Sequence, residues 1–144
     1  MADLRQASKI AFATEFTFYL KSHYFHWNVE GVMFLQFHDL FGKIYEEVFG
    51  SIDTFAEQLR ALDVYAPTGL SKYSMINHIA DEESAPRPLD MVRELYEDSQ
   101  KITKLLKICF DMATAEGEDG YANFLAERMD AHRQHSWMLR SSLK

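Results

Sequence analysis

Four of the side chains in this sequence that could bind a transition metal lie in two groups. His26 and His38 stand on either side of a break that contains Gly31. Asp53 and Glu57 lie four positions apart further along the chain. Two imidazoles with two carboxylates are a plausible ligand set for Fe(II), because they combine nitrogen donors with harder oxygen donors. The same residue types also occur as partly buried histidines and solvated acidic helix faces, so metal binding is one of two interpretations.

The spacing of these residues decides whether they can share an ion. A helical pattern from about Phe34 to Leu62 places His38 near one end and Asp53 near the other. At 1.5 Å per residue the two are about 22 Å apart, so they cannot bind the same ion within one chain. A two-fold dimer with antiparallel copies of this helix would bring His38 of one subunit to Asp53 and Glu57 of the other. A metal site at these residues therefore requires a dimer.

A metal site inside one chain is not expected. Di-iron helical bundles use inward-facing glutamates together with Glu-x-x-His pairs. None of the glutamates in this sequence has a histidine three residues later. The pair His132-x-x-His135 falls on the apolar face of a helical pattern, which favours core packing over metal binding.

Helical periodicity accounts for most of the chain. Four long segments are predicted: about Leu4 to Asn28, Phe34 to Leu62, a segment that follows Pro88 and ends at Gly117, and a segment from Glu118 and Asp119 to about Ser142. Between the second and third of these, residues 63–88 contain the three prolines and a glycine, and Leu70 to Ala80 could form a short helix. The first and third connections between these four segments are short, and the second is long. This order predicts an all-α, ferritin-like four-helix bundle with a short extra helix in the long connection. We expect a single domain over residues 1–144.

Composition narrows the classes of function. The 144 residues are 47% hydrophobic and 26% charged, with a formal net charge of −7, which is typical of a globular protein. No segment approaches the ~18 apolar residues of a membrane span. The single cysteine, Cys109, lies in an apolar stripe and is expected to be a small buried hydrophobe. We expect a cytoplasmic protein without membrane contact.

The residues around the two histidines resemble the signature of the Dps family, the miniferritins. The resemblance rests on His26-Trp27-Asn28-Val29-Glu30-Gly31, then Phe34, His38, Tyr45, Asp53 and Ala56-Glu57, and on Glu116 to Leu143 with His135-Ser136-Trp137-Met138-Leu139-Arg140-Ser141. It covers nearly the whole chain. It implies a dodecameric shell of four-helix subunits with ferroxidase centres at the two-fold interfaces. There Fe(II) would be oxidised, preferentially by hydrogen peroxide, and stored as ferric mineral, which protects against oxidative damage.

The resemblance also implies roles for individual residues. His26 and His38 match metal ligands from one subunit. Asp53 and Glu57 match ligands from its partner. Trp27 matches a tryptophan beside the centre that intercepts radicals, although an ordinary packing aromatic is equally consistent with the sequence.

Gly42 departs from the pattern of the family. The resemblance implies an acidic ligand one turn after the second histidine, and glycine cannot bind metal there. His23, one turn from His26 on the same face, and Glu46 are the candidate substitutes. Asp39 points about 100° round the helix. If neither substitute acts, the alternative function is a shell that binds metal with weak or no ferroxidase activity.

Two further features bear on iron uptake and on DNA. Glu118 and Asp119 match acids that line three-fold pores in the family, while acids at a helix start also complement the helix dipole. A structural or DNA-compacting protein is another alternative function. The net charge of −7 and the absence of a lysine-rich tail argue against direct DNA binding, because a phosphate backbone is bound by Lys and Arg.

Overall fold

The computed structural model describes residues 3–144, and within them it contains helices and no strand. The helices are α1 (Leu4–Asn28), α2 (Phe34–Ala61), α3 (Leu70–Ile76), α4 (Pro88–Ala115) and α5 (Asp119–Ser142). The predicted all-α architecture, with a short helix in the long connection, is confirmed. The short helix ends at Ile76, four residues earlier than expected, because the chain turns at Asn77 into extended backbone.

The ends of the helices follow from local chemistry. The Asp3 side chain caps α1 by accepting a 2.9 Å hydrogen bond from the backbone N–H of Gln6. Pro88 occupies the first turn of α4, where the missing N–H costs nothing. Gly31 and Gly117 adopt positive φ angles of 113° and 76° in the turns after α1 and α4. Such angles strain residues with a side chain, so both turns favour glycine.

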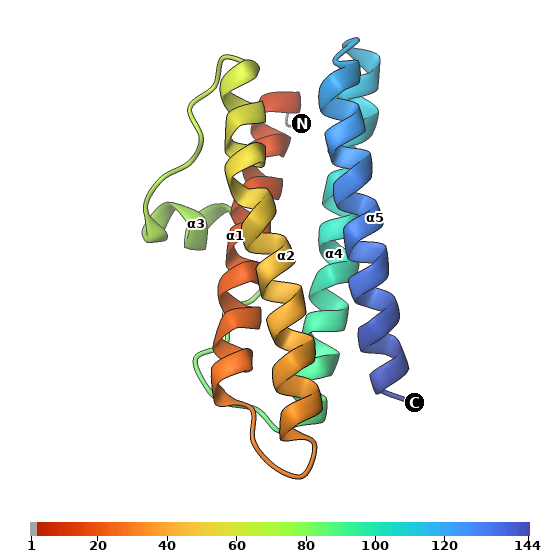
Figure 1. The fold of residues 1–144 in the computed structure, drawn as a ribbon. Helices are drawn as coiled ribbons and strands as arrows, with labels where there is room; N and C mark the ends of the chain where they lie inside the picture. The colour runs from red at the N-terminus through yellow and green to blue at the C-terminus, as the bar shows by residue number, and fades with distance from the viewer. Residues whose placement is uncertain (1–2) are drawn as a thin grey trace.

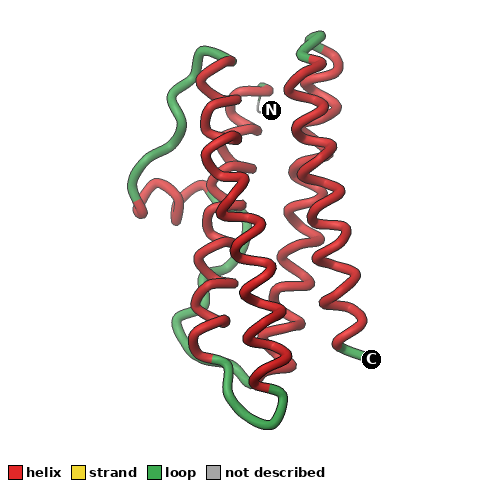
Figure 2. Tube along the Cα trace, viewed as in Figure 1, coloured by secondary structure: helices red, strands yellow, loops and turns green. Residues whose placement is uncertain are grey.

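The helices form two antiparallel pairs that pack against each other (Figure 1). One pair is α1 with α2, the other is α4 with α5, and α3 lies against the outer side of α1. The long connection returns along the bundle, so that α4 begins at the end where α2 begins (Figure 2). As a result, the last turn of α1, the first turn of α2 and the C-terminus of the chain share one end of the molecule.

The apolar core runs the length of the bundle. Its largest fully buried apolar side chains are Phe18, Phe25, Phe41, Ile44, Phe55, Leu59, Met91, Leu95, Ile102, Leu106 and Leu125. Cys109 is also buried, and burial raises the pKa of its thiol to about 11, as expected of an inert core cysteine. Among the described helices, none has the length and apolar character needed to cross a membrane.

The buried side of α1 is unusual because it carries many polar residues. Ser8, Thr14, Glu15, Lys21 and Ser22 are all buried. Phe18 and Phe25 are buried on the same side of the helix, whereas Phe16, which stacks on Tyr73 of α3, is only partly buried. The side of α1 that enters the core therefore cannot be found from apolar periodicity alone.

Candidate metal centre

His26 and His38 lie against each other where α1 ends and α2 begins. Their rings stack with centroids 3.8 Å apart and planes 15° from parallel. Nδ1 of His26 lies 2.6 Å from the carbonyl oxygen of His38, and Nδ1 of His38 lies 2.7 Å from the carbonyl oxygen of His26. A carbonyl oxygen only accepts, so each Nδ1 carries a proton and donates it. Each neutral ring then has an unprotonated Nε2, which is how metal-binding histidines are commonly oriented.

Gly42 provides the space for the ring of His26. A Cβ atom at position 42 would lie 3.0 Å from Cε1 and 3.1 Å from Nδ1 of His26. Both contacts are tighter than ordinary van der Waals distances, so a side chain at this position would require the ring of His26 to move by a few tenths of an ångström. The absence of a side chain at position 42 thus leaves room for the imidazole in its stack on His38.

His23 lies beside the histidine pair and is held by two tyrosines. Its ring stacks on Tyr45 at 3.8 Å, with planes 8° from parallel. Its Nδ1 shares a 3.2 Å hydrogen bond with the hydroxyl group of Tyr19. Its ring centroid is 6.2 Å from that of His26. Burial, and then the charge of His26, lower the pKa of His23, so its ring is neutral at pH 7.

Trp27 is on the same surface as these histidines. Its ring centroid is 4.4 Å from that of His23, and 57% of the residue is exposed to solvent. A large aromatic side chain that is more than half exposed beside a candidate site can contact either a ligand or a second protein chain.

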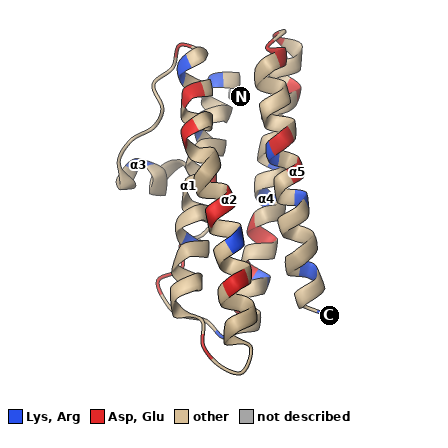
Figure 3. Cartoon of the chain, viewed as in Figure 1, with Lys and Arg blue, Asp and Glu red and all other residues tan. Residues whose placement is uncertain are grey.

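Asp53 and Glu57 are exposed near the other end of α2. Acidic side chains recur along this helix (Figure 3). Within residues 3–144, no three His, Cys, Asp or Glu side chains converge on a point that could hold a metal ion. The fold of one chain therefore brings His26 and His38 together but leaves the two carboxylates apart from them.

The other acids named from the sequence do not contact the histidine pair. Asp39 forms an exposed ion pair with Lys43 at 3.1 Å. Glu46 is exposed on α2. Glu118 and Asp119 are exposed at the start of α5, at the end of the bundle opposite to the histidines (Figure 1).

An ionic cluster that the sequence did not predict lies between α1, α2 and α5, and its members are buried except for Glu47, whose side chain is 38% exposed. Arg128 donates to Glu15 at 2.9 Å and to Glu47 at 2.5 and 3.2 Å. His132 and His135 contact the same two carboxylates. The prediction that both histidines are buried in the core is confirmed, but their partners are ionic. The available signal was Glu15 itself, a single charged residue within the largely apolar residues 10–19 of α1.

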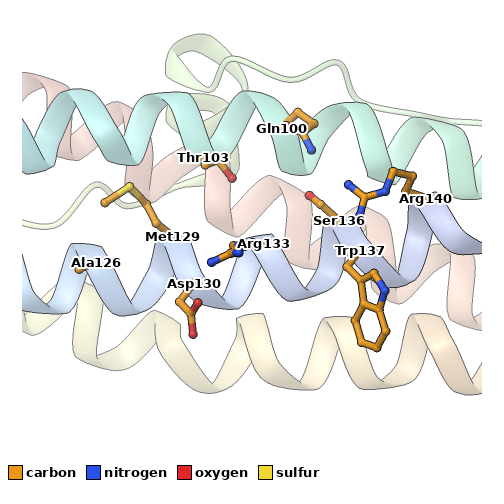
Figure 4. A pocket seen from close by; sticks show the side chains of 9 residues that line it. All are labelled: Gln100, Thr103, Ala126, Met129, Asp130, Arg133, Ser136, Trp137 and Arg140. Carbon is orange, nitrogen blue, oxygen red and sulfur yellow. The ribbon is translucent and has the colours of Figure 1, made fainter.

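A groove between α4 and α5 has a volume of about 700 Å³ (Figure 4). It is lined by Gln100, Thr103, Ala126, Met129, Asp130, Arg133, Ser136, Trp137 and Arg140. Only one of these residues is a carboxylate and none is a histidine, so the groove lacks a set of metal ligands. The candidate chemistry lies with the histidine pair on α1 and α2.

Comparison with known proteins agrees with the fold. Residues 10–144 match the family model of the ferritin-like domain. General stress protein 20U of Bacillus subtilis is 32% identical over 87% of this chain and 86% of its own length. The DNA protection during starvation protein of Brevibacillus brevis is 29% identical over 88% of this chain and 85% of its own.

Solved structures agree as well. A Dps protein from Bacillus brevis superposes with a TM-score of 0.92 and 26% identity over the full length of both chains. Dps from Thermosynechococcus elongatus superposes with a TM-score of 0.94, covering 98% of this chain and 90% of that chain; at 24% identity this likeness concerns the fold. The polypeptide, with its histidine pair at the junction of α1 and α2, belongs to the Dps family of ferritin-like proteins.

Proposed function

We propose that this protein is a miniferritin that binds Fe(II) at inter-subunit ferroxidase centres, oxidises it with hydrogen peroxide and stores ferric iron inside a dodecameric cage. The observation that supports this most directly is the pair of imidazoles whose Nδ1 protons are committed to backbone carbonyls. Both Nε2 atoms are therefore free to bind a metal ion without the loss of a proton. The Dps structure from Vibrio cholerae is described as a member of a superfamily of ferritin-like diiron-carboxylate proteins, which agrees with iron as the substrate.

The roles of the residues follow from their chemistry. In the proposed dimer, His26 and His38 bind Fe(II) from one subunit, and Asp53 and Glu57 bind it from a second copy of the chain. The two carboxylates stabilise the trivalent product more than the divalent substrate, because the added charge interacts with both of them. Hydrogen peroxide takes one electron from each of two Fe(II) ions, its O–O bond breaks, and two protons complete two water molecules. Trp27, beside the centre, supplies an electron to any radical that escapes this reaction.

Gly42 supports a second candidate function. Glycine has no side chain, so position 42 supplies no ligand that could complete the shell of a second ion. His23 and Glu46 are the proposed substitutes. If neither acts, the shell binds metal but oxidises Fe(II) slowly or not at all.

Iron uptake and the mode of protection are proposed from the charged residues of the chain. We place iron uptake at three-fold pores lined by Glu118 and Asp119, both exposed at the start of α5. The formal charge of −7 per chain disfavours contact with the DNA backbone. We therefore propose that the protein acts in the cytoplasm by removing Fe(II) and peroxide together, and not by covering DNA.

Mixed assemblies test the inter-subunit site. One parent carries His26→Ala and His38→Ala, and the other carries Asp53→Asn and Glu57→Gln. Each parent alone should oxidise Fe(II) no faster than buffer. After unfolding and co-assembly in equal amounts, half of the dimers are mixed, and each mixed dimer has one site with all four ligands. The mixture should then recover about a quarter of the wild-type rate.

The result depends on normal assembly, which sizing of both parents checks. Asp111→Asn, a substitution of an exposed acid on α4, serves as the control and should leave oxidation unchanged. Two inactive parents that assemble normally, and whose mixture remains inactive, would refute a centre shared between subunits. If one parent alone retains full activity, the residues replaced in that parent are not ligands of the centre.

A further inference from the structure

Three carboxylates gather around the buried ammonium group of Lys21. Its Nζ lies 2.8 Å from Asp98 Oδ2 and 3.9 Å from Glu94 Oε1, both on α4. The third is Glu82 of the long connection, which lies within hydrogen-bond reach of the carboxyl group of Glu94. Lys21 also donates to the carbonyl oxygen of Ala80 at 3.1 Å. With every group ionised, three negative charges would face one positive charge, which favours the uptake of a proton by one carboxylate.

Glu94 is the carboxylate that takes up this proton. Its Oε2 atom is buried, and among the described residues no donor reaches it, so the ionised form is poorly stabilised. Burial raises the pKa of Glu94 to about 7; the charge of Lys21 opposes this shift, while Glu82 and Asp98 add to it. Within the described chain, α5 contributes no charged group to this set. Glu82 accepts from the backbone N–H of Ser84 at 2.9 Å and from its hydroxyl group at 2.6 Å, and these bonds lower its pKa. A protonated Glu94 therefore donates to an ionised Glu82.

The link between Glu82 and Glu94 joins a sparsely attached segment to the bundle. On one side of the segment, the carbonyl of Ala80 accepts a hydrogen bond from α1, and on the other the carbonyl of Arg87 accepts one from the first turn of α4. Residues 81–86 between them are exposed or half-buried. Their other hydrogen bonds, within the part of the chain that the structure describes, stay inside the segment. Loss of the link therefore leaves residues 81–86 without a hydrogen bond to the helices.

We propose that Glu82 and Glu94 form a pH-sensitive latch, which holds residues 81–86 against α4 while the two carboxyl groups share a proton and releases them when that proton passes to solvent. The attached segment is one wall of a hollow of about 420 Å³, and Tyr24 and Asn28 of α1 line the other. Release of the segment therefore opens this side of the last turns of α1 to water. The latch uses neither the histidine pair nor the carboxylates of α2, so it does not depend on the proposed iron chemistry.

The direction of the pH effect follows from the two states of Glu94. Its pKa is about 7 in the attached state and falls towards its ordinary value of 4.5 when the segment is released. Because attachment raises this pKa, the segment is held most firmly below pH 4.5, where Glu94 is protonated in both states. Attachment weakens as the pH rises from 4.5, and it is weakest above about pH 7, where the proton is absent from both states.

A nitroxide spin label in the segment tests the latch, because its spectrum reports local mobility. Ala85→Cys places the label at an exposed position, and the native thiol of Cys109 is buried and unreactive. With no other change, the label should be immobilised at about pH 5 and mobile at about pH 8.5. When Glu94→Gln is added, the neutral amide still donates to Glu82, so the label should stay immobilised at both pH values. When Glu82→Ala is added instead, the label should be mobile at both.

The matched control is Glu97→Gln, which neutralises an exposed acid on the same helix and should keep the pH dependence of the label. Circular dichroism at the same pH values should show unchanged helix content, which separates release of the segment from unfolding. Equal mobility at both pH values in the protein labelled at position 85 alone would overturn the proposal. So would a Glu94→Gln protein that keeps the pH dependence. If Glu94→Gln does not fold, Glu82→Gln replaces it, since an amide there bonds to either form of Glu94 and should likewise abolish the pH dependence.

Discussion

The imidazole of each of His26 and His38 donates to the backbone carbonyl of the other, at 2.6 and 2.7 Å. The carbonyl of His26 lies in the last turn of α1, where carbonyl groups lack partners within the helix. The side chain of His38 therefore caps α1 while its own backbone holds the first histidine. This double link joins two helices and fixes both proposed ligands before any metal arrives. Such preorganisation reduces the entropy lost on binding.

Gly42→Ala should weaken metal binding at the histidine pair. The added Cβ would meet the ring of His26 at 3.0 Å, and the ring would have to shift by a few tenths of an ångström from its stacked position on His38. We expect a loss of affinity for Co(II) of about tenfold or more. Gly42→Asp should also slow Fe(II) oxidation, although it restores a carboxylate. Calorimetric titration measures the first effect and stopped-flow absorbance the second.

The matched control is Gly120→Ala, because a Cβ at that helical position meets nothing within 4 Å. Its affinity for Co(II) should equal that of the wild type. Unchanged affinity in Gly42→Ala would show that the ring tolerates the contact, and that position 42 does not position His26.

His23→Phe should distinguish the two candidate substitute ligands. Phenylalanine can keep the stacking on Tyr45 but cannot bind metal. If His23 supplies a ligand, this variant should bind fewer Fe(II) ions per centre and oxidise them more slowly, whereas Glu46→Gln should behave as the wild type. Anaerobic Fe(II) titration gives the number of ions bound. The opposite pattern would assign the role to Glu46.

The protein should become less stable in acid because residues of the ionic cluster take up protons. The pKa of Glu15 is lowered from 4.5 to about 2, so its contribution is fully present above pH 4.5 and is lost as the pH falls towards 2. A shift of this size corresponds to about 3 kcal/mol. Burial lowers the pKa of His135, which reduces stability in the same direction below about pH 6.5. Denaturant unfolding at several pH values should show that the free energy of unfolding falls less steeply with decreasing pH in Glu15→Gln than in the wild type. The same pH dependence in both proteins would contradict the role given to Glu15.

Lys21 links α1 to α4 and to the long connection through hydrogen bonds. Its buried ammonium group donates to Asp98 Oδ2 at 2.8 Å and to the carbonyl of Ala80 at 3.1 Å. Lys21→Met should destabilise the protein by about 3–5 kcal/mol, because it leaves the carboxylate of Asp98 buried without a cation. Adding Asp98→Leu should recover much of this loss in denaturant unfolding. If the double variant is as unstable as the single one, packing rather than charge is responsible.

The positions of the helices could be predicted from the sequence because they depend on local signals. Apolar residues recurring at helical spacing, together with glycine and proline at the breaks, placed α1 at its observed bounds and α2 within one residue of them. The helical rise of 1.5 Å per residue also showed that His38 and Asp53 cannot meet within one chain. These conclusions use only the geometry of a single helix.

Contacts between helices could not be predicted in this way. Which side of α1 is buried, which residues surround Arg128, and that Gly42 makes room for His26 all depend on residues far apart in the sequence. The buried side of α1 combines alanine, serine and phenylalanine residues with Glu15 and Lys21, so charged residues interrupt its apolar pattern. The charged members are stable there because partners from α4 and α5 neutralise them. Those partners are brought into place by the packing of the whole bundle, which is why only the tertiary structure reveals them.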